Sequence, residues 1–178
     1  QWAEMRIFGV GNISLVLVTI CLAAGIGALT WNKSIDYLEA GFQAREGLDS
    51  IHDANFPKAL VSLDRAIDLA PDVSTYYTLR AAVYQGYQTQ EDGARAPECS
   101  RLAEAAPYQT CLIRRAHMSN LEAARLRPLD WRLRLNLANS ALTLALTERD
   151  PDMANEAIGL YREVAHLDPQ TSWHWEWL

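Results

Sequence analysis

The sequence lacks the short motifs by which most enzyme active sites are recognised. It contains no GxSxG nucleophile turn, no HExxH helix, no phosphate-cradling glycine loop and no dinucleotide-binding fingerprint. Its histidines, His52, His117, His166 and His174, are dispersed, and an isolated helical histidine is usually a surface residue or a hydrogen-bonded core residue. We therefore expect the chain to be no enzyme and to have no catalytic residue, cofactor or metal site.

Strand signals and low-complexity tracts are also missing. No run of alternating β-branched residues is bounded by turn pairs, so the pattern after Asn32 predicts an all-α fold. The net charge of −6 argues against general binding to nucleic acid. That charge is uneven, because residues 95–134 hold eight arginines against four acidic residues, whereas residues 33–94 and 135–178 each carry a net −5.

Charge is absent from the 25 residues between Ile7 and Trp31, both included. As a helix at about 1.5 Å per residue, this stretch would span roughly 37 Å, more than the roughly 30 Å hydrocarbon core of a membrane. Trp2 and Trp31 stand at its ends, where interfacial aromatic residues belong. A signal peptide is the competing interpretation, but its apolar core is usually only about 7–15 residues long. We predict a single transmembrane helix with short flanks in residues 1–32, followed by a separate domain in residues 33–178.

The predicted membrane helix offers a packing surface and no visible chemistry. It has no histidine that could ligate a haem or a chlorin. Its small residues Ala23, Ala24, Gly27 and Ala28 form pairs four positions apart, which allow another helix to approach closely. The alternative is that glycine and alanine are simply common in membrane helices.

The rest of the chain repeats one short helical pattern three times. An alanine is followed by a small or short residue seven positions later and by a proline twelve positions later: Ala59, Ala66 and Pro71; Ala116, Ala123 and Pro128; Ala157, Val164 and Pro169. We expect the alanines to be buried where neighbouring helices come close. Each proline predicts a helix end, because proline cannot continue the hydrogen-bond ladder. Asn55 with Pro57, and Asp150 with Pro151, predict two helix starts.

This spacing resembles the second helix of the tetratricopeptide repeat (TPR), a helix–turn–helix unit of about 34 residues. Gly47 matches the small residue of the family's first helix, and Tyr77, Ala81 and Tyr84 match its aromatic, small and aromatic positions. The resemblance implies an all-α solenoid of about three hairpin units, at residues 40–73, 74–130 and 131–171, with the start of a fourth at 172–178. Two spacings exceed the family period, by about 23 and 7 residues, and Asn120 stands at a bulky position. A generic array of helical hairpins is the alternative.

The longer insertion falls between the helices of the second unit and carries Cys99 and Cys111. Cys21 lies in the predicted membrane span and cannot join them. We expect a disulfide between Cys99 and Cys111 if the domain faces an oxidising compartment, and two free cytoplasmic thiols are the alternative. A zinc site is disfavoured, because there is no CxxC motif and His117 is the only imidazole nearby.

The resemblance also implies a concave groove, lined by the first helices, that holds peptides or partner helices. The third unit presents Arg132, Asn136 and Asn139 toward that groove. Arg132 and Arg134 would suit an acidic peptide or a carboxylate through bidentate hydrogen bonds. The alternative is that these arginines pair internally, with Glu122 and the acidic neighbouring units.

The sequence ends in SWHWEWL, whose Trp173, Trp175 and Trp177 stand where a fourth unit would start. Three tryptophans in five residues require covering, so we expect either a longer polypeptide or a partner that docks there. A membrane helix leading into such repeats also resembles, more weakly, the C-terminal region of bacterial O-antigen ligases and polymerases, which assemble lipid-linked polysaccharide. The catalytic part of such an enzyme would lie outside this chain.

These patterns predict a bacterial, membrane-anchored scaffold or docking subunit whose partners are other proteins of a membrane complex or an acidic peptide. The expected disulfide places the repeat domain outside the cytoplasm, in the periplasm or at the cell surface. The alternative is the C-terminal repeat domain of a polytopic polysaccharide-assembly enzyme.

Overall fold

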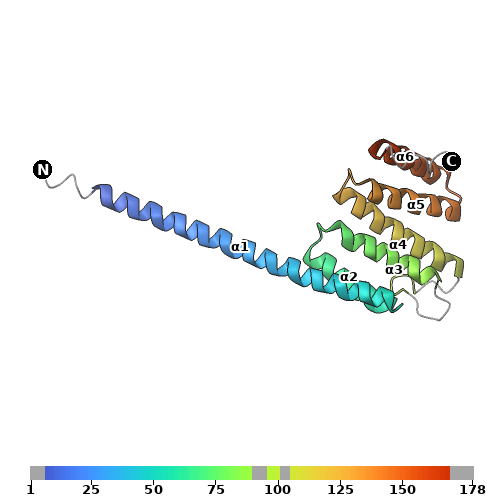
Figure 1. Ribbon diagram of the computed structural model, residues 1–178, viewed down its shortest axis with the longest axis horizontal. Helices are drawn as coiled ribbons and strands as arrows, with labels where there is room; N and C mark the ends of the chain where they lie inside the picture. Colours follow the sequence, from blue (N-terminus) through green and yellow to red (C-terminus); the bar gives the residue numbers. More distant parts are fainter. Residues whose placement is uncertain (1–6, 90–95, 101–104, 169–178) are drawn as a thin grey trace. The chain divides into compact units, whose positions relative to one another are not determined.

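The computed structural model describes residues 7–89, 96–100 and 105–168. Every regular element in these ranges is an α-helix (Figure 1). In chain order the helices are α1 (Ile7–His52), α2 (Phe56–Leu69), α3 (Ser74–Thr89), α4 (Ala105–Leu126), α5 (Trp131–Glu148) and α6 (Pro151–Leu167). The predicted all-α class is confirmed.

The chain forms two compact units, Gln1–Glu39 and Ala40–Leu178, and α1 contributes to both. The second of these units, which we call the repeat unit, starts within α1 at Ala40. The physical reason is burial: Ala40, with no exposed surface, is the first residue of α1 that the described structure covers completely.

One stretch of the described residues is long and apolar enough to cross a membrane, and it lies within Val18–His52 of α1. None of its most apolar window is buried inside the protein, whereas the core helix of a soluble domain would be mostly buried. A signal sequence meets the same criteria of length and composition, so these criteria alone only weakly indicate a membrane anchor.

Side-chain caps fix the beginnings of three helices. The Asn55 side chain accepts a hydrogen bond from the backbone N–H of Lys58 at 3.3 Å, and a proline follows in the first turn of α2. Asp130 caps α5 in the same way. Asp150 caps α6 by accepting from two backbone N–H groups at 2.9 and 3.2 Å, with Pro151 in the first turn. Both predicted helix starts are confirmed.

The prolines of the repeat also fall where helices end. Helix α2 ends at Leu69 and α4 at Leu126, each two residues before the proline of its repeat. Pro169, the third of these prolines, lies outside the described residues.

The repeated small positions bring the helices of the repeat unit close together. At most 3% of the surface is exposed at each of Ala59, Ala66, Ala116, Ala123, Ala157 and Val164. A Cβ atom built on Gly47 would lie only 2.8 Å from Cγ of Leu63, so no larger residue fits there without movement. Consecutive helices from α2 to α6 pack on one another. Each hairpin therefore covers the apolar face of the next, as stacked repeats require.

The structure corrects the extent of the insertion. Helix α3 runs to Thr89 and α4 begins at Ala105, so Cys111 lies within α4 and not in a loop. Pro107 stands in the first turn of α4, where proline is tolerated because no intrahelical hydrogen bond is lost. Part of the segment counted as inserted therefore lengthens α4 at its N-terminal end.

The segment 96–100 folds back onto the repeat core. Ala96 and Cys99 are both fully buried, in a cluster that includes Phe56 and Tyr87. The disulfide joins Cys99 to Cys111 of α4, with their Cα atoms 5.9 Å apart.

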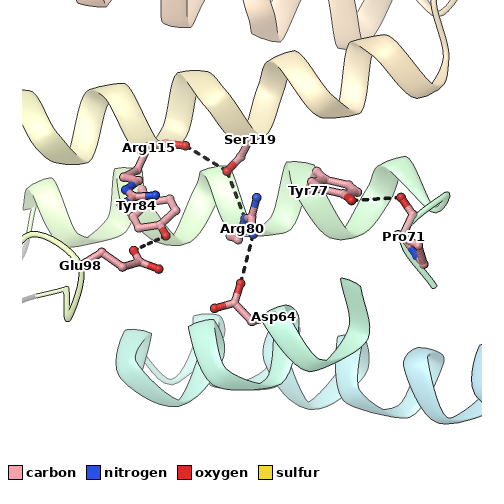
Figure 2. A network of polar contacts seen from close by, with 8 residues as sticks. All are labelled: Asp64, Pro71, Tyr77, Arg80, Tyr84, Glu98, Arg115 and Ser119. Atoms are coloured by element: carbon pink, nitrogen blue, oxygen red, sulfur yellow. Dashed lines mark hydrogen bonds and ion pairs between the residues drawn. The ribbon is translucent and has the colours of Figure 1, made fainter. Parts of the chain in front are cut away.

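Two tyrosine hydroxyls hold the same segment. The backbone N–H of Ala96 donates to the hydroxyl of Tyr108 at 3.0 Å. The hydroxyl of Tyr84 donates to the carboxylate of Glu98 at 2.5 Å (Figure 2). The segment is thus tied to both helices of the second unit.

Candidate functional site

A pocket of about 210 Å³ opens where α3, α4 and α5 meet. It is lined by Gln85 and Gln88 of α3, by Ile113 and Ala116 of α4, and by Asn139, Ser140 and Thr143 of α5. Side-chain amides and hydroxyls each donate and accept hydrogen bonds. The polar side chains of the lining are all uncharged, which suits a ligand with its own unpaired N–H and C=O groups.

Polar contacts behind the pocket hold α4 against α5. The hydroxyl of Ser140 donates to the carbonyl of Leu137 at 2.9 Å, and Nδ1 of His117 lies 3.2 Å from the same hydroxyl oxygen. Because the Ser140 proton points to Leu137, Nδ1 of His117 is the donor in the second contact. Burial lowers the pKa of His117, although Glu156 acts in the opposite direction. The buried imidazole of His117 therefore links α4 to Ser140, one of the residues that line the pocket.

A second polar contact joins the same two helices. Asn120, at 3% exposure, donates from its side-chain nitrogen to the carbonyl of Asn136 at 3.4 Å. The family pattern places a bulky residue at the Asn120 position. The hydrogen bond satisfies part of the buried amide, which explains how a polar side chain is accommodated there.

The structure brings only one of the predicted groove residues into the pocket. Asn139 lines it, and its Oδ1 accepts a hydrogen bond from the hydroxyl of Tyr161 at 2.7 Å. Asn136 is exposed but does not line the pocket, and its backbone carbonyl is the acceptor of Asn120. Arg132 is exposed and stacks over the ring of Trp131, with its Cζ 5.3 Å from the ring centroid.

Arg134 is engaged within the protein. Its Nη1 lies 3.3 Å from a carboxylate oxygen of Glu163 in α6, and its Nε donates to the carbonyl of Pro128 at 3.2 Å. Glu122 pairs with Arg125 at 2.8 Å. Arg134 therefore has an internal partner, which is Glu163 and not the predicted Glu122.

A network that the sequence analysis missed ties α2, α3 and α4 together (Figure 2). Arg80 of α3 contacts Asp64 of α2 at 3.2 Å and donates from Nε to the hydroxyl of Ser119 in α4 at 3.2 Å. Its guanidinium also stacks over the ring of Tyr77, 5.3 Å from the centroid. The available signal was a charged residue between Tyr77 and Ala81, on the side of α3 that the repeat pattern buries.

Burial and the ion pair with Arg80 shift the pKa of Asp64 in opposite directions. Burial raises the pKa of Asp64 above its usual value and outweighs the lowering by the hydrogen bond and charge of Arg80. The network therefore fixes the relative positions of three helices without adding much free energy as an ion pair. It is architectural.

Some predicted site residues remain untested. Trp173, Trp175 and Trp177 lie outside the described residues. In the compact unit Gln1–Glu39, Ala23, Ala24 and Gly27 are exposed, and nothing in the described structure lies within 4 Å of a Cβ atom built on Gly27. The side chain of Ala28 is not described. Among the described residues, no group of three His, Cys, Asp or Glu side chains is placed to hold a metal ion.

Comparison with known proteins supports the fold. No protein-family model matches the sequence, and no curated protein matches it. Among solved structures, the chain is similar to the TPR domain of Arabidopsis OM64, with a TM-score of 0.52 and 17% identity over 76% of this chain and 88% of that one. At this identity the likeness establishes a TPR-like helical solenoid and nothing about its ligand. None of the comparisons supports the resemblance to O-antigen ligases and polymerases.

Proposed function

We propose that this protein is a membrane-anchored, non-catalytic scaffold that binds an extended segment of a partner protein in the pocket between α3 and α5. The observation that carries the proposal is the uncharged polar lining contributed by Gln85, Gln88, Asn139 and Thr143. An extended peptide presents unpaired N–H and C=O groups along its length, and amide side chains can bind both.

The size of the pocket also favours a peptide. At about 210 Å³ it is smaller than the roughly 300–1,000 Å³ typical of small-molecule sites. Ile113 and Ala116 add apolar surface to the lining, against which an apolar side chain of the segment could pack. Arg134, one of the two arginines that favoured an acidic peptide, pairs with Glu163 within the protein and does not line this pocket. We therefore propose a segment bound mainly through its backbone.

Selection from a random peptide phage library with the purified full chain tests this proposal. We expect the selected peptides to bind at least about tenfold more weakly to the Gln85→Ala and Asn139→Ala variants, a loss of about 1.4 kcal/mol for each. Fluorescence anisotropy with labelled peptides measures the affinities. Met118→Ala is the matched control, because Met118 is 50% exposed on α4 and does not line the pocket. Equal affinities for the pocket variants and this control would exclude the pocket as the binding site.

The anchoring part of the proposal is supported by the apolar stretch of α1, whose described side chains from Val18 to Gly27 are exposed. A helix with such a surface is stable in a bilayer and prone to aggregate in water. We expect the chain to stay in the membrane pellet after alkaline carbonate extraction. Replacing Leu22 and Ile26 by Lys should release it into the supernatant, because charge near the middle of a span is unfavourable. Complete release of the unmodified chain would contradict the anchor.

A further inference from the structure

We propose that Tyr161 of α6 is a positioning residue for the pocket between α3 and α5, where it orients the side-chain amide of Asn139 so that the pocket selects a carbonyl oxygen of the bound segment. The hydroxyl of Tyr161 donates to Oδ1 of Asn139 at 2.7 Å, and Asn139 lines the pocket. Tyr161 is not one of the described lining residues, so it acts through Asn139. This inference rests on the proposed function, because it assigns the peptide group that Asn139 binds.

The length of this hydrogen bond assigns the two ends of the Asn139 amide. A separation of 2.7 Å lies at the commonest distance for O–H···O bonds, about 2.7–2.8 Å, and below the roughly 2.9–3.0 Å of N–H···O bonds. Burial raises the pKa of Tyr161 above its usual value of 10.0, so the phenol keeps its proton and remains a donor throughout the physiological pH range. A donor must meet the amide oxygen, because the amide nitrogen cannot accept.

Nδ2 of Asn139 is therefore the end of the amide that is left for a ligand. Among the described residues, none accepts a hydrogen bond from it. An asparagine amide that could turn over would bind a carbonyl or an N–H group equally well. The hydrogen bond from Tyr161 removes that choice, because turning the amide over would place its N–H groups against a hydroxyl that already carries a proton.

The two hydroxyl groups on the same wall of the pocket use their protons inside α5. Ser140 donates to the carbonyl of Leu137 at 2.9 Å, and Thr143 donates to the backbone carbonyl of Asn139 at 2.8 Å. Their oxygens can still accept, but their protons are already engaged. Among the described lining residues of α5, Nδ2 of Asn139 is thus the one group that can donate to a ligand.

A donor and an acceptor one helical turn apart match the edge of an extended peptide. Asn139 and Thr143 are four residues apart on α5 and therefore lie on the same face of the helix. An extended segment presents rows of unpaired carbonyl and N–H groups along its edges. We expect Nδ2 of Asn139 to donate to one such carbonyl, and Oγ1 of Thr143 to accept from an N–H group.

A double-mutant cycle with the full chain separates positioning from general support of the pocket. The probe is a labelled, uncharged peptide from the phage selection, and fluorescence anisotropy measures its affinity. We expect Tyr161→Phe to weaken binding about three- to tenfold in the unmodified chain, the usual effect of one hydrogen bond. In the Asn139→Ala background the same change should have no effect, because no amide remains to be positioned. Tyr76→Phe is the matched control, because Tyr76 is a half-buried tyrosine of α3 that does not line the pocket.

Asn139→Asp tests the assignment of the donor directly. The carboxylate keeps an oxygen for the hydroxyl of Tyr161 but has no N–H group, so we expect a loss of at least about tenfold in affinity, as for Asn139→Ala. The loss should persist at high salt, which screens the added charge but does not restore the donor. Unchanged binding by Tyr161→Phe, an equal loss in both backgrounds, or full affinity of Asn139→Asp would each overturn the proposal.

Nuclear magnetic resonance of the full chain in detergent micelles reads the orientation without any peptide. With isotope-labelled asparagine, Tyr161→Phe should shift the side-chain amide resonances of Asn139, whereas Tyr76→Phe should leave them in place. Unchanged resonances in Tyr161→Phe would overturn the positioning role. Failure of the peptide-binding proposal would instead appear as equal affinities for Asn139→Ala and the unmodified chain, with the amide shift still present, so the two failures are distinguishable.

Discussion

Glycine and alanine determine how closely the helices of the repeat unit approach one another. Gly47 faces Leu63, whose side chain is fully buried and whose Cγ would lie 2.8 Å from a Cβ atom built on Gly47. Gly159, in contrast, lies inside α6 with nothing within 4 Å of a built Cβ. The two glycines have the same helical context but opposite surroundings. The same substitution at the two glycines therefore separates the effect of packing from the effect of helix propensity.

The Gly47→Ala and Gly159→Ala substitutions should change stability in opposite directions. At Gly159, alanine improves helix propensity, so we expect a gain of about 0.5–1 kcal/mol in the free energy of unfolding. At Gly47 the same gain is outweighed by overpacking, which typically costs about 1–3 kcal/mol. Urea unfolding followed by circular dichroism measures both. A stabilised Gly47→Ala variant would show that α1 and α2 are not in close contact there.

The buried imidazole of His117 makes stability depend on pH. Its pKa in the folded protein is lowered from 6.5, chiefly by burial. The unfolded chain therefore binds a proton at a higher pH than the folded chain does. The stabilising contribution of the neutral imidazole is complete above pH 6.5 and is lost as the pH falls from 6.5 through the lower folded pKa.

We expect His117→Gln to weaken the pH dependence of unfolding between pH 7.5 and 5.5. One proton of linkage gives a slope of at most about 1.4 kcal/mol per pH unit, with stability falling toward acid. Urea unfolding of the unmodified chain and of the variant at both values gives the difference. An identical decline in the two proteins would assign the acid sensitivity to other groups.

Among the elements, the segment 96–100 depends most on a covalent link. It has no helix of its own, yet Ala96 and Cys99 are fully buried in the core beside α3 and α4. Its hydrogen bonds to Tyr84 and Tyr108 and the disulfide to Cys111 offset the loss of chain entropy that its position requires.

Replacing both Cys99 and Cys111 by Ser should destabilise the repeat unit by about 3 kcal/mol, the chain-entropy value for a loop of this length. Limited proteolysis should then cut near residues 96–100 before it cuts within α5 or α6. The measurements are urea unfolding and mass spectrometry of the first fragments. Cys21→Ser is the control, because this cysteine is free and exposed. An unchanged unfolding midpoint for the double variant would mean that the native protein is reduced.

At the scale of the whole molecule, the disulfide bears on the topology of the chain if α1 is the membrane anchor that we propose. A stable disulfide between Cys99 and Cys111 requires an oxidising compartment. Arg6 and Lys33, on either side of the apolar stretch, are too balanced to orient it by the positive-inside rule. Redox state is therefore the better guide to topology.

We expect an impermeant maleimide to label Cys99 and Cys111 in intact cells only after treatment with a reductant. This result would place residues 33–178 outside the cytoplasm. A Cys21→Ser background removes the third thiol from the assay. Labelling that needs permeabilised membranes but no reductant would contradict the topology and the disulfide together.

The residue pattern was sufficient to predict the all-α class, the caps at Asn55 and Asp150, and the ends of α2 and α4. Asn55, Asp150 and the prolines at 71 and 128 act within one or two turns of chain, so their effect on the backbone can be read locally. The repeated alanines were likewise identified from spacing alone, because a stack of hairpins needs small residues at regular intervals.

Tertiary structure decided which polar groups meet. The pairing of Arg134 with Glu163, the bridge from Arg80 to Asp64 and Ser119, and the pocket lined by both Gln85 and Asn139 each join residues on different helices. Spacing along one helix shows which face a residue occupies but not which neighbour lies opposite. That neighbour depends on how the hairpins pack, since ion pairs and hydrogen bonds form only within a few ångströms.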